Sequence, residues 1–329
     1  MLDININNMI LILSTPEDID TNLVIEWLNF KKIPVFRLND EDLMMGRTNI
    51  KYTPSNEVLI ENSSKSISVN DVKIVWYRKF GFLTDYYDIF EGNNDLMQYM
   101  LSEFRSLKLF LFETLSKKKW LCDRQNPISK MEMLNKAKSV KIKIPDTIIC
   151  TRKNELDFFF LKNNRSIITK SIGDARFIKY KTYGFMFHTH KIENINDFDE
   201  VFSPSLFQEY IEKTIEIRTF YLNEECYSMA IFSQNNENTK LDFRNYDSEI
   251  PNRFVPYKLP EKLEKKITVF MKSINLNTGS LDLIKSSKDD DYYFLEVNPC
   301  GQFGMTSNPC NYNLHEKVAN FLIKAQYEN

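Results

Sequence analysis

The sequence predicts a mixed α/β (α+β) protein built from more than one domain. Its 329 residues are enough for two or three domains with a sizeable core. Residues 9–38 give a buried strand, an amphipathic helix and a second strand, which is the order of a β-α-β unit. Later segments add several strands, a strand pair and further helices, so the fold is not limited to that unit.

The overall composition excludes several classes of protein. Aromatic residues make up 13% of the chain and the formal net charge is −2, which argues against disorder and against a basic surface for nucleic acid or a membrane. The five cysteines are widely spread without a CxxC pair, and there are only three histidines. We therefore expect reduced thiols and no zinc site. No apolar run approaches the roughly 20 residues that span a bilayer, so a cytoplasmic protein is expected.

The first 118 residues are predicted to form one α/β domain. "MILIL" reads as a buried strand, "NLVIEWL" as a helix and "IPVFRL" as a second, parallel strand. No Gly-rich fingerprint follows the first strand, which argues against a dinucleotide site there. "EVLIE" and "SISV" predict a hairpin, "VKIVWYRKFG" a further strand, and residues 95–118 a long helix that ends in "KKK".

The remaining residues divide into two further predicted parts. In 119–204, a helix after "NPIS" is followed by the strands "DTIIC" and "SIITK". In 205–329, the strands "LFQEYI" and "EIRTFYL" precede an amphipathic helix in "LPEKLEKKITVFMKSINL". "GSLDLI" and "YYFLEVN" then form a predicted hairpin across a charged loop, and "NLHEKVANFLIKAQ" forms the last helix.

The predicted hairpin carries a set of oxygen ligands. In an extended "FLEVN", alternation places Phe294, Glu296 and Asn298 on one face, and Asp282 lies on the partner strand. Two carboxylates and an amide, without His or Cys, suit Mg²⁺, which takes few carboxylates together with substrate phosphates. The alternative is a polar face exposed to solvent.

Cationic residues accompany these ligands along the chain. Lys130 begins a helix, Lys170 ends a strand, and Arg218 lies in the strand after "QEYIEK"; "DFRN" adds Arg244 and Asn245. Each alone would be read as a surface charge. Phosphoryl transfer, however, needs cations and a metal to neutralise the transferring group, with little covalent work for the protein.

The ordered set of motifs resembles the ATP-grasp ligases. "SKMEML", "IPDT", "IITK", "QEYIEK", "EIRTF", "DFRN", "LDLI" and "FLEVNP" follow the order of that family over residues 126–299, and resemble its ribosomal-protein glutamate ligase branch. The resemblance implies a pre-ATP-grasp N-terminal α/β domain (1–118), a central domain (119–204) and a C-terminal ATP-grasp domain (205–329). It also implies ATP and Mg²⁺, and a reaction in which a phosphorylated carboxylate is attacked by an amine or a hydroxyl.

The two ends of the chain narrow the resemblance. "VWYRKFG", "EVNPCGQFG" and "NPCNYNL" are similar to the graspetide (microviridin-type) peptide maturases, and the nearest type is the maturase of grasp-with-spasm systems. This implies a ribosomally synthesised precursor peptide with a leader as the partner. Asp or Glu side chains of that peptide would be joined to Ser, Thr or Lys as ω-ester or ω-amide rings. Nucleic acid and membrane are not expected partners, and a homodimer is one open alternative.

The resemblance assigns roles position by position. The resemblance implies that the ATP phosphates contact Lys130 and Lys170, and that the ribose contacts Glu216. It implies that the γ-phosphate and the acyl phosphate face Arg218 and Arg244, with Asn245 beside them. The residues implied to surround adenine are Gln208, Glu209, Tyr210 and Ile211, and those implied to hold Mg²⁺ are Asp282, Glu296 and Asn298. The phosphate loop departs from the family because it holds only Gly173 and Gly184.

Alternatives remain for one residue and for the function. Arg78 is the candidate for gripping acidic side chains of the peptide, because Arg suits bidentate carboxylate recognition; alternatively it holds its strand to a neighbouring acid. The chain could instead add free amino acids to a protein tail, or be a non-catalytic ATP-binding regulatory module.

We expect Cys300 and Cys310 to be structural, and His188 and His190 to lie on the surface.

Overall fold

A computed structural model gives the fold of the chain. It describes residues 8–81, 93–123, 128–173, 177–180, 183–186, 189–234, 239–241, 243 and 251–328. The chain forms two compact units. Unit 1 comprises Met1–Pro127, Leu276–Gly279 and Pro299–Asn329, and unit 2 comprises Ile128–Asn275 and Ser280–Asn298.

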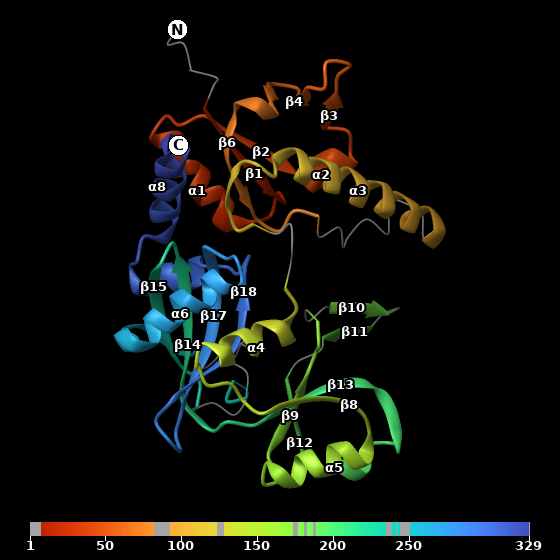
Figure 1. Cartoon of the computed structure of the whole chain (residues 1–329), viewed down its shortest axis with the longest axis vertical. Helices are drawn as coiled ribbons and strands as arrows, with labels where there is room; N and C mark the ends of the chain where they lie inside the picture. The colour runs from red at the N-terminus through yellow and green to blue at the C-terminus, as the bar shows by residue number, and fades with distance from the viewer. Residues whose placement is uncertain are drawn as a thin grey trace. The chain divides into compact units, whose positions relative to one another are not determined.

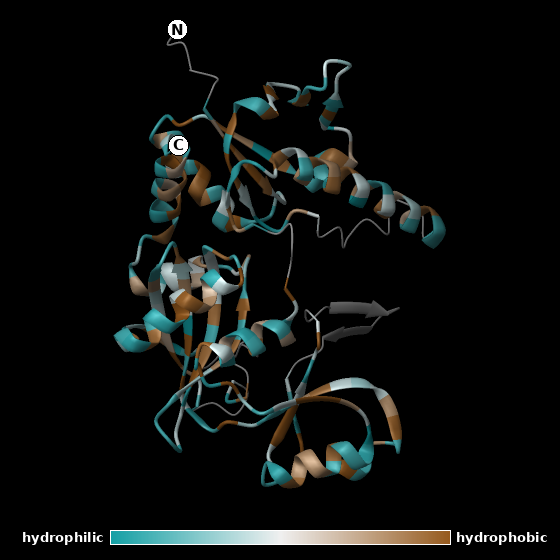
Figure 2. Ribbon diagram, in the orientation of Figure 1, coloured by the Kyte–Doolittle hydropathy of each residue, from teal (hydrophilic) through white to brown (hydrophobic). Residues whose placement is uncertain are grey.

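A four-stranded parallel sheet forms the centre of unit 1, in the order β2-β1-β6-β7 (Figure 1). Its strands are β1 (Met9–Ser14), β2 (Val35–Asn39), β6 (Val72–Tyr77) and β7 (Lys119–Leu121). All six residues of β1 are buried, in keeping with the hydrophobic residues that Figure 2 colours brown within this sheet. The predicted β-α-β unit is confirmed, because α1 (Ile19–Phe30) connects the parallel strands β1 and β2.

Helices and a small sheet cover the central sheet of unit 1. The last helix, α8 (Leu314–Tyr327), packs against α1, β1 and β6. The long helix α3 (Asn94–Leu115) contributes Phe104, Leu111, Phe112 and Leu115 to the core. The predicted hairpin is confirmed and forms part of a three-stranded antiparallel sheet. The other elements here are α2 (Asp40–Met44), β3 (Thr48–Tyr52), β4 (Val58–Asn62), β5 (Ser66–Ser68) and α7 (Gly304–Cys310).

The described residues of unit 2 form two larger antiparallel sheets and a separate two-stranded one. The first has the order β12-β9-β13-β8, and the second has the order β16-β15-β14-β17-β18. The first sheet and its neighbours are α4 (Lys130–Ser139), β8 (Thr147–Arg152), α5 (Lys153–Lys162), β9 (Ile167–Lys170), β12 (His190–Ile192) and β13 (Val201–Glu209), with a separate hairpin of β10 (Phe177–Tyr180) and β11 (Tyr183–Met186).

The second sheet of unit 2 carries the hairpin predicted to hold a metal. Its elements are β14 (Lys213–Leu222), β15 (Glu225–Phe232), β16 (Arg253–Tyr257), α6 (Glu261–Ser273), β17 (Thr278–Ser286) and β18 (Tyr292–Asn298). The antiparallel pairing of β17 with β18 confirms the hairpin. Helix α6 is amphipathic as predicted, and it buries Leu263, Ile267, Phe270 and Met271.

A β-bulge corrects the predicted face of β18. Asp282 pairs with Glu296 and Leu283 with Phe294, so Leu295 is an extra residue without an opposite partner. A bulge changes the alternation of side chains. Phe294 consequently packs on Phe270 of α6, with ring centroids 5.0 Å apart, while Leu295 and Glu296 line a pocket. The expectation that Phe294 and Glu296 share one face was wrong.

The two compact units do not divide residues 128–275 further, so the domain boundaries at 118 and 204 stay a prediction. Among the described residues, no helix has both the length and the apolar character that crossing a bilayer would require.

Candidate functional site

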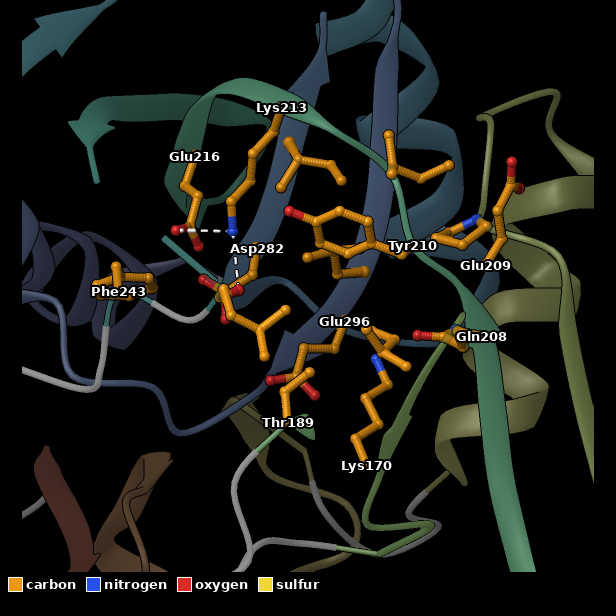
Figure 3. Close-up of a pocket in the computed structure, with 16 residues that line it drawn as sticks. Lys170, Thr189, Gln208, Glu209, Tyr210, Lys213, Glu216, Phe243, Asp282 and Glu296 are labelled. Carbon is orange, nitrogen blue, oxygen red and sulfur yellow. Dashed lines mark hydrogen bonds and ion pairs between the residues drawn. The ribbon is translucent and has the colours of Figure 1, made fainter. Parts of the chain in front are cut away.

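A pocket in unit 2 is lined by both of its sheets (Figure 3). Strands β9 and β13 form one wall, and β14, β17 and β18 form the other. Eight of the residues assigned by resemblance line it: Lys170, Gln208, Glu209, Tyr210, Ile211, Glu216, Asp282 and Glu296. Apolar lining comes from Pro145, Ile168, Leu241, Phe243, Ile284 and Leu295. Sequence reasoning missed these apolar residues, because their burial around a cavity follows from strand pairing and not from local pattern.

The segment that leaves β13 supplies hydrogen-bonding groups to the pocket. The Gln208 side chain is fully buried; its Nε2 donates to Thr147 Oγ1 over 2.9 Å, whereas Oε1 has no hydrogen-bond partner among the described residues. A buried acceptor without a partner is costly unless a ligand or water satisfies it. Within the described chain, Ile211 N–H has no backbone partner, whereas Tyr210 N–H donates to the Ser166 carbonyl.

Two carboxylates lie opposite each other at the far wall. Asp282 and Glu296 are direct partners in the β17–β18 pairing. Asp282 Oδ1 accepts from Arg218 over 2.9 Å, and Glu296 Oε2 lies 3.3 Å from Lys130 Nζ. Arg218 of β14 and Lys130 at the start of α4 therefore each pair with one of the two carboxylates. The phosphate and metal roles assigned to these residues stay a prediction. Arg218 Nε is buried and has no partner within the described part.

The donor set fits a hard divalent cation. It offers two carboxylates on adjacent strands and the exposed Asn298 side chain at the end of β18, and oxygen donors of this kind suit Mg²⁺. Among the described residues there is no cluster of three or more His, Cys, Asp or Glu side chains that could hold a metal alone. Mg²⁺ characteristically keeps water or phosphate oxygens as its other ligands, so a site with few protein ligands is in keeping with that ion.

Lys213 is a buried pocket residue that sequence reasoning missed. Its Nζ lies 3.0 Å from Glu216 Oε1 and donates to the Leu241 carbonyl over 2.9 Å, as Figure 3 shows. Glu216 Oε1 also accepts from Ser233 Oγ over 2.7 Å. In the sequence, Lys213 lies between Glu212 and Thr214 and looks like a solvated surface charge, so no local signal reveals it.

Several assigned residues lie elsewhere or outside the described residues. Arg244, Asn245 and His188 are outside the described residues, and so are residues 174–176, 181, 182 and 187 between β9 and β12. His190 is exposed at the start of β12, as expected. Cys310 is buried, in keeping with a structural role.

Arg78 lies in unit 1 and is only 3% exposed. Its guanidinium binds Asp18 at 3.1 Å and approaches Asp20 at 3.5 Å, and it donates to the Gly301 carbonyl over 3.1 Å. These contacts favour the alternative in which Arg78 holds its strand to neighbouring acids. A direct contact with a peptide carboxylate stays an untested prediction, and the burial of the guanidinium counts against it.

Comparison with known proteins identifies the fold. The sequence matches no model of a protein family, and no curated protein matches it. Solved structures do match. One is a RiPP-associated ATP-grasp ligase from Chryseobacterium gregarium in complex with ADP and a leader and core peptide, with a TM-score of 0.86, 24% identity, and coverage of 96% of this chain and 97% of that chain.

Two further structures extend this likeness. The macrocyclase MdnC from Microcystis aeruginosa MRC, bound with precursor peptide MdnA, gives a TM-score of 0.78 at 22% identity over 96% of this chain and 99% of that chain. The D-alanine–D-alanine ligase from Bacillus anthracis gives a TM-score of 0.53 at 13% identity, with coverage of 97% of each chain. The chain therefore has the ATP-grasp fold over nearly its whole length, in the form that peptide-modifying ligases also adopt.

Proposed function

We propose that this chain is an ADP-forming ligase that modifies a ribosomally made precursor peptide. It would activate Asp or Glu side chains of the peptide as acyl phosphates and join them to Ser or Thr hydroxyls or Lys amines, which closes ω-ester or ω-amide rings. The observation that carries the proposal is the pocket in unit 2, which brings a hydrogen-bonding hinge and the Asp282–Glu296 pair to one cavity. The likeness to two peptide-bound ligases supports the choice of substrate.

The hinge is suited to an adenine ring. Adenine carries an exocyclic amino group, which is a donor, beside a ring nitrogen, which is an acceptor. Gln208 Oε1 is a buried acceptor without a partner among the described residues, and Ile211 N–H is a donor without a backbone partner there. The apolar side chains Ile168, Ile284 and Leu295 line the same pocket, so they can cover the faces of the ring.

The charged groups are suited to the phosphates. Lys170 and Lys130 would contact phosphate oxygens, and Arg218 would face the transferred group. Asp282, Glu296 and Asn298 would hold Mg²⁺, which when bound neutralises phosphate charge. Because Lys130 and Arg218 lie beside these carboxylates, each cation is already close to the position where phosphate charge would gather. The assigned roles of Arg244, Asn245 and Glu216 remain part of the proposal.

The chemistry proceeds in two balanced steps. In the first, a peptide carboxylate oxygen attacks the γ-phosphorus of ATP, the bond to the β,γ-bridging oxygen breaks, and ADP leaves. In the second, a hydroxyl or amine of the peptide attacks the acyl carbon, loses its proton, and displaces inorganic phosphate. The net change in the peptide is the loss of one water for each ring.

The partner is proposed to include a leader segment that binds away from the reacting groups. A peptide with many carboxylates and hydroxyls has little to distinguish one from another near the reacting centre, so a remote binding segment raises the effective concentration of the right core. A cytoplasmic location and a homodimer are compatible with this proposal.

The test is incubation of the purified chain with ATP, Mg²⁺ and the precursor peptide encoded beside it. We expect peptide-dependent release of ADP and phosphate, and a mass loss of one water for each linkage. AMP and pyrophosphate as products would instead indicate adenylation and overturn the proposal. A mass gain on a protein tail would favour the amino-acid ligase, and nucleotide binding without turnover would favour the regulatory module.

A further inference from the structure

Two cysteines that lie far apart in the sequence meet inside unit 1. Cys122 directly follows β7, and Cys300 lies between β18 and α7. Their Sγ atoms are 3.7 Å apart, although the two residues are 178 positions apart in the sequence. Neither cysteine is in a disulfide, and both are buried in the hydrophobic core of unit 1. The two reactive atoms therefore lie side by side without a bond between them.

The fold fixes the position of Cys122. Its backbone N–H donates to Asn277 Oδ1 over 3.0 Å, and Asn277 Nδ2 donates to the Trp120 carbonyl over 2.7 Å. Cys122 also has a φ of +63°, in the left-handed region that residues other than glycine seldom adopt. A residue stays in that region only when the surrounding structure determines it. The direction of the Cys122 side chain is thus set by its contacts in unit 1.

The backbone on each side of Cys300 is held in the same unit. The carbonyl of Pro299, which precedes it, accepts from Cys122 Sγ over 3.4 Å. The carbonyl of Gly301, which follows it, accepts from the Arg78 guanidinium over 3.1 Å. All of these residues belong to unit 1. These contacts keep the two sulfur atoms within reach of each other.

The geometry leaves a short path to a disulfide. An S–S bond is about 2.05 Å long, so sulfur atoms at 3.7 Å need only a small approach, which rotation of the side chains can supply. Cys300 is 8% exposed, whereas Cys122 is fully buried. Because oxidation follows access to the thiol, a small oxidant should react first at Cys300, with Cys122 in place as the second thiol.

We propose that Cys122 and Cys300 form a redox-sensitive pair that a hydroperoxide converts to a disulfide. With hydrogen peroxide, the Cys300 sulfur attacks one oxygen, the O–O bond breaks, and a sulfenic acid and one water form. The Cys122 sulfur then attacks the Cys300 sulfur, the S–O bond breaks, and the hydroxyl leaves with the Cys122 proton as a second water. The two thiols together lose two electrons and two protons, and the peroxide is reduced.

The new bond would close a covalent loop that contains the whole sequence of unit 2. The two segments of that unit, Ile128–Asn275 and Ser280–Asn298, both lie between the two cysteines along the chain. A cross-link that closes a long loop restricts the unfolded chain and so favours the folded one. Oxidation would therefore raise the stability of the protein, and a thiol reductant would reverse the change. This inference does not depend on the proposed ligase activity.

The experiment treats the folded, full-length chain with hydrogen peroxide and identifies the products by mass spectrometry. We expect the intact protein to lose two hydrogen atoms, and a non-reduced digest to contain the peptides of Cys122 and Cys300 joined together. The midpoint of thermal unfolding should rise by at least about 5 °C, as the cross-link of a long loop predicts for a chain of this size. Dithiothreitol should restore both the mass and the midpoint.

Cys122→Ala tests the order of the two steps. Without the second thiol, the sulfenic acid at Cys300 should persist and react with dimedone, and a failure to label Cys300 would contradict the order. Cys310→Ala is the matched control, because Cys310 is also buried in unit 1, and it should form the disulfide as the wild type does.

The wild-type protein decides the proposal even if a variant fails to fold. A peroxide-treated wild type without the linked peptides of Cys122 and Cys300 would overturn the redox pair. Linked peptides without a higher midpoint would overturn the stabilising effect of the bond. Neither readout requires nucleotide or peptide, so a failure of the proposed ligase function would leave this test unchanged.

Discussion

Two sets of ion pairs, one in each unit, differ in how far the protein itself satisfies them. In unit 1, Arg78 and Asp18 have side-chain exposures of 3% and 1%. In unit 2, Lys130 and Glu296 are exposed at 24% and 21% beside the pocket. Buried charges are tolerated only when they are paired and hydrogen-bonded, whereas partly exposed pairs can exchange one partner for a ligand. Charge type alone therefore does not distinguish these two pairs, whereas burial does: Arg78–Asp18 is buried and Lys130–Glu296 is partly exposed.

The pKa of Asp18 shows the same distinction. Burial by itself would raise the pKa of Asp18, but Arg78, together with Thr21 and Lys79, holds that pKa well below the ordinary value of 3.8. The charge network thus stabilises the ionised carboxylate strongly. Such a group contributes to folding stability and is poorly suited to giving up its partner to a substrate.

The largest expected effect is that of Glu296→Gln. Loss of this carboxylate removes one metal ligand and leaves Lys130 without its partner, so ATP-dependent modification of the peptide should fall by at least about 100- to 1,000-fold, the usual cost of losing one electrostatic contact to a transition state. Circular dichroism should show an intact fold, because the pair is partly exposed. Glu264→Gln, at the Lys258 pair on α6, is the matched control. Near-normal turnover by Glu296→Gln would remove the active-site assignment.

The next effect concerns stability. Asp18→Asn should lower the free energy of unfolding by about 3 kcal/mol near neutral pH, because it leaves the buried Arg78 with Asp20 as its remaining acid. The folded-state pKa of Asp18 is depressed, so its contribution is present above about 3.8 and is lost as the pH falls from there toward the folded value. Urea unfolding of both proteins at several pH values should show the difference shrinking below pH 4. A difference that stays constant with pH would contradict the assignment to the Asp18 charge.

Replacing Arg78 tests whether this buried arginine stabilises the fold or contacts the peptide. Arg78→Ala should reduce stability at least as much as Asp18→Asn, since two buried carboxylates lose a partner. If the variant instead keeps wild-type stability and ATP binding but loses peptide processing, the arginine contacts the peptide and the interpretation from burial is wrong.

The smallest effect tests the hinge. Gln208→Met removes the buried acceptor Oε1 and should weaken ATP binding by about 10-fold, the equivalent of one hydrogen bond of about 1.4 kcal/mol. The ratio of ATP affinity to GTP affinity should also fall. Guanine carries a carbonyl oxygen, an acceptor, at the ring position where adenine carries its amino group, a donor. Titration with both nucleotides measures this. Thr147→Val, which removes the hydroxyl that orients the Gln208 amide, should give a smaller change of the same sign; an unchanged ATP affinity in Gln208→Met would exclude a contact with the base.

The sequence by itself determined the order of the elements and named about half of the residues that line the pocket. Strand and helix periodicity are local properties, so the β-α-β unit, α6 and the β17–β18 hairpin could be predicted from spacing. The motif order also named eight residues on the two pocket walls, among them Lys170 and Glu296, whose roles stay a prediction. These are features that neighbouring residues encode directly.

Only the tertiary structure decided the rest. The bulge at Leu295 depends on register with the partner strand, so alternation along β18 alone gave the wrong face for Phe294. The burial of Lys213 and Arg78, both charged in sequence, depends on the acids that distant segments bring to them: Glu216 for the first, and Asp18 and Asp20 for the second. The free energy of a charged group is set by its solvation and its partners, and both are fixed only when the chain folds. No local pattern could therefore have distinguished the buried Arg78 network from the charged residues of the pocket.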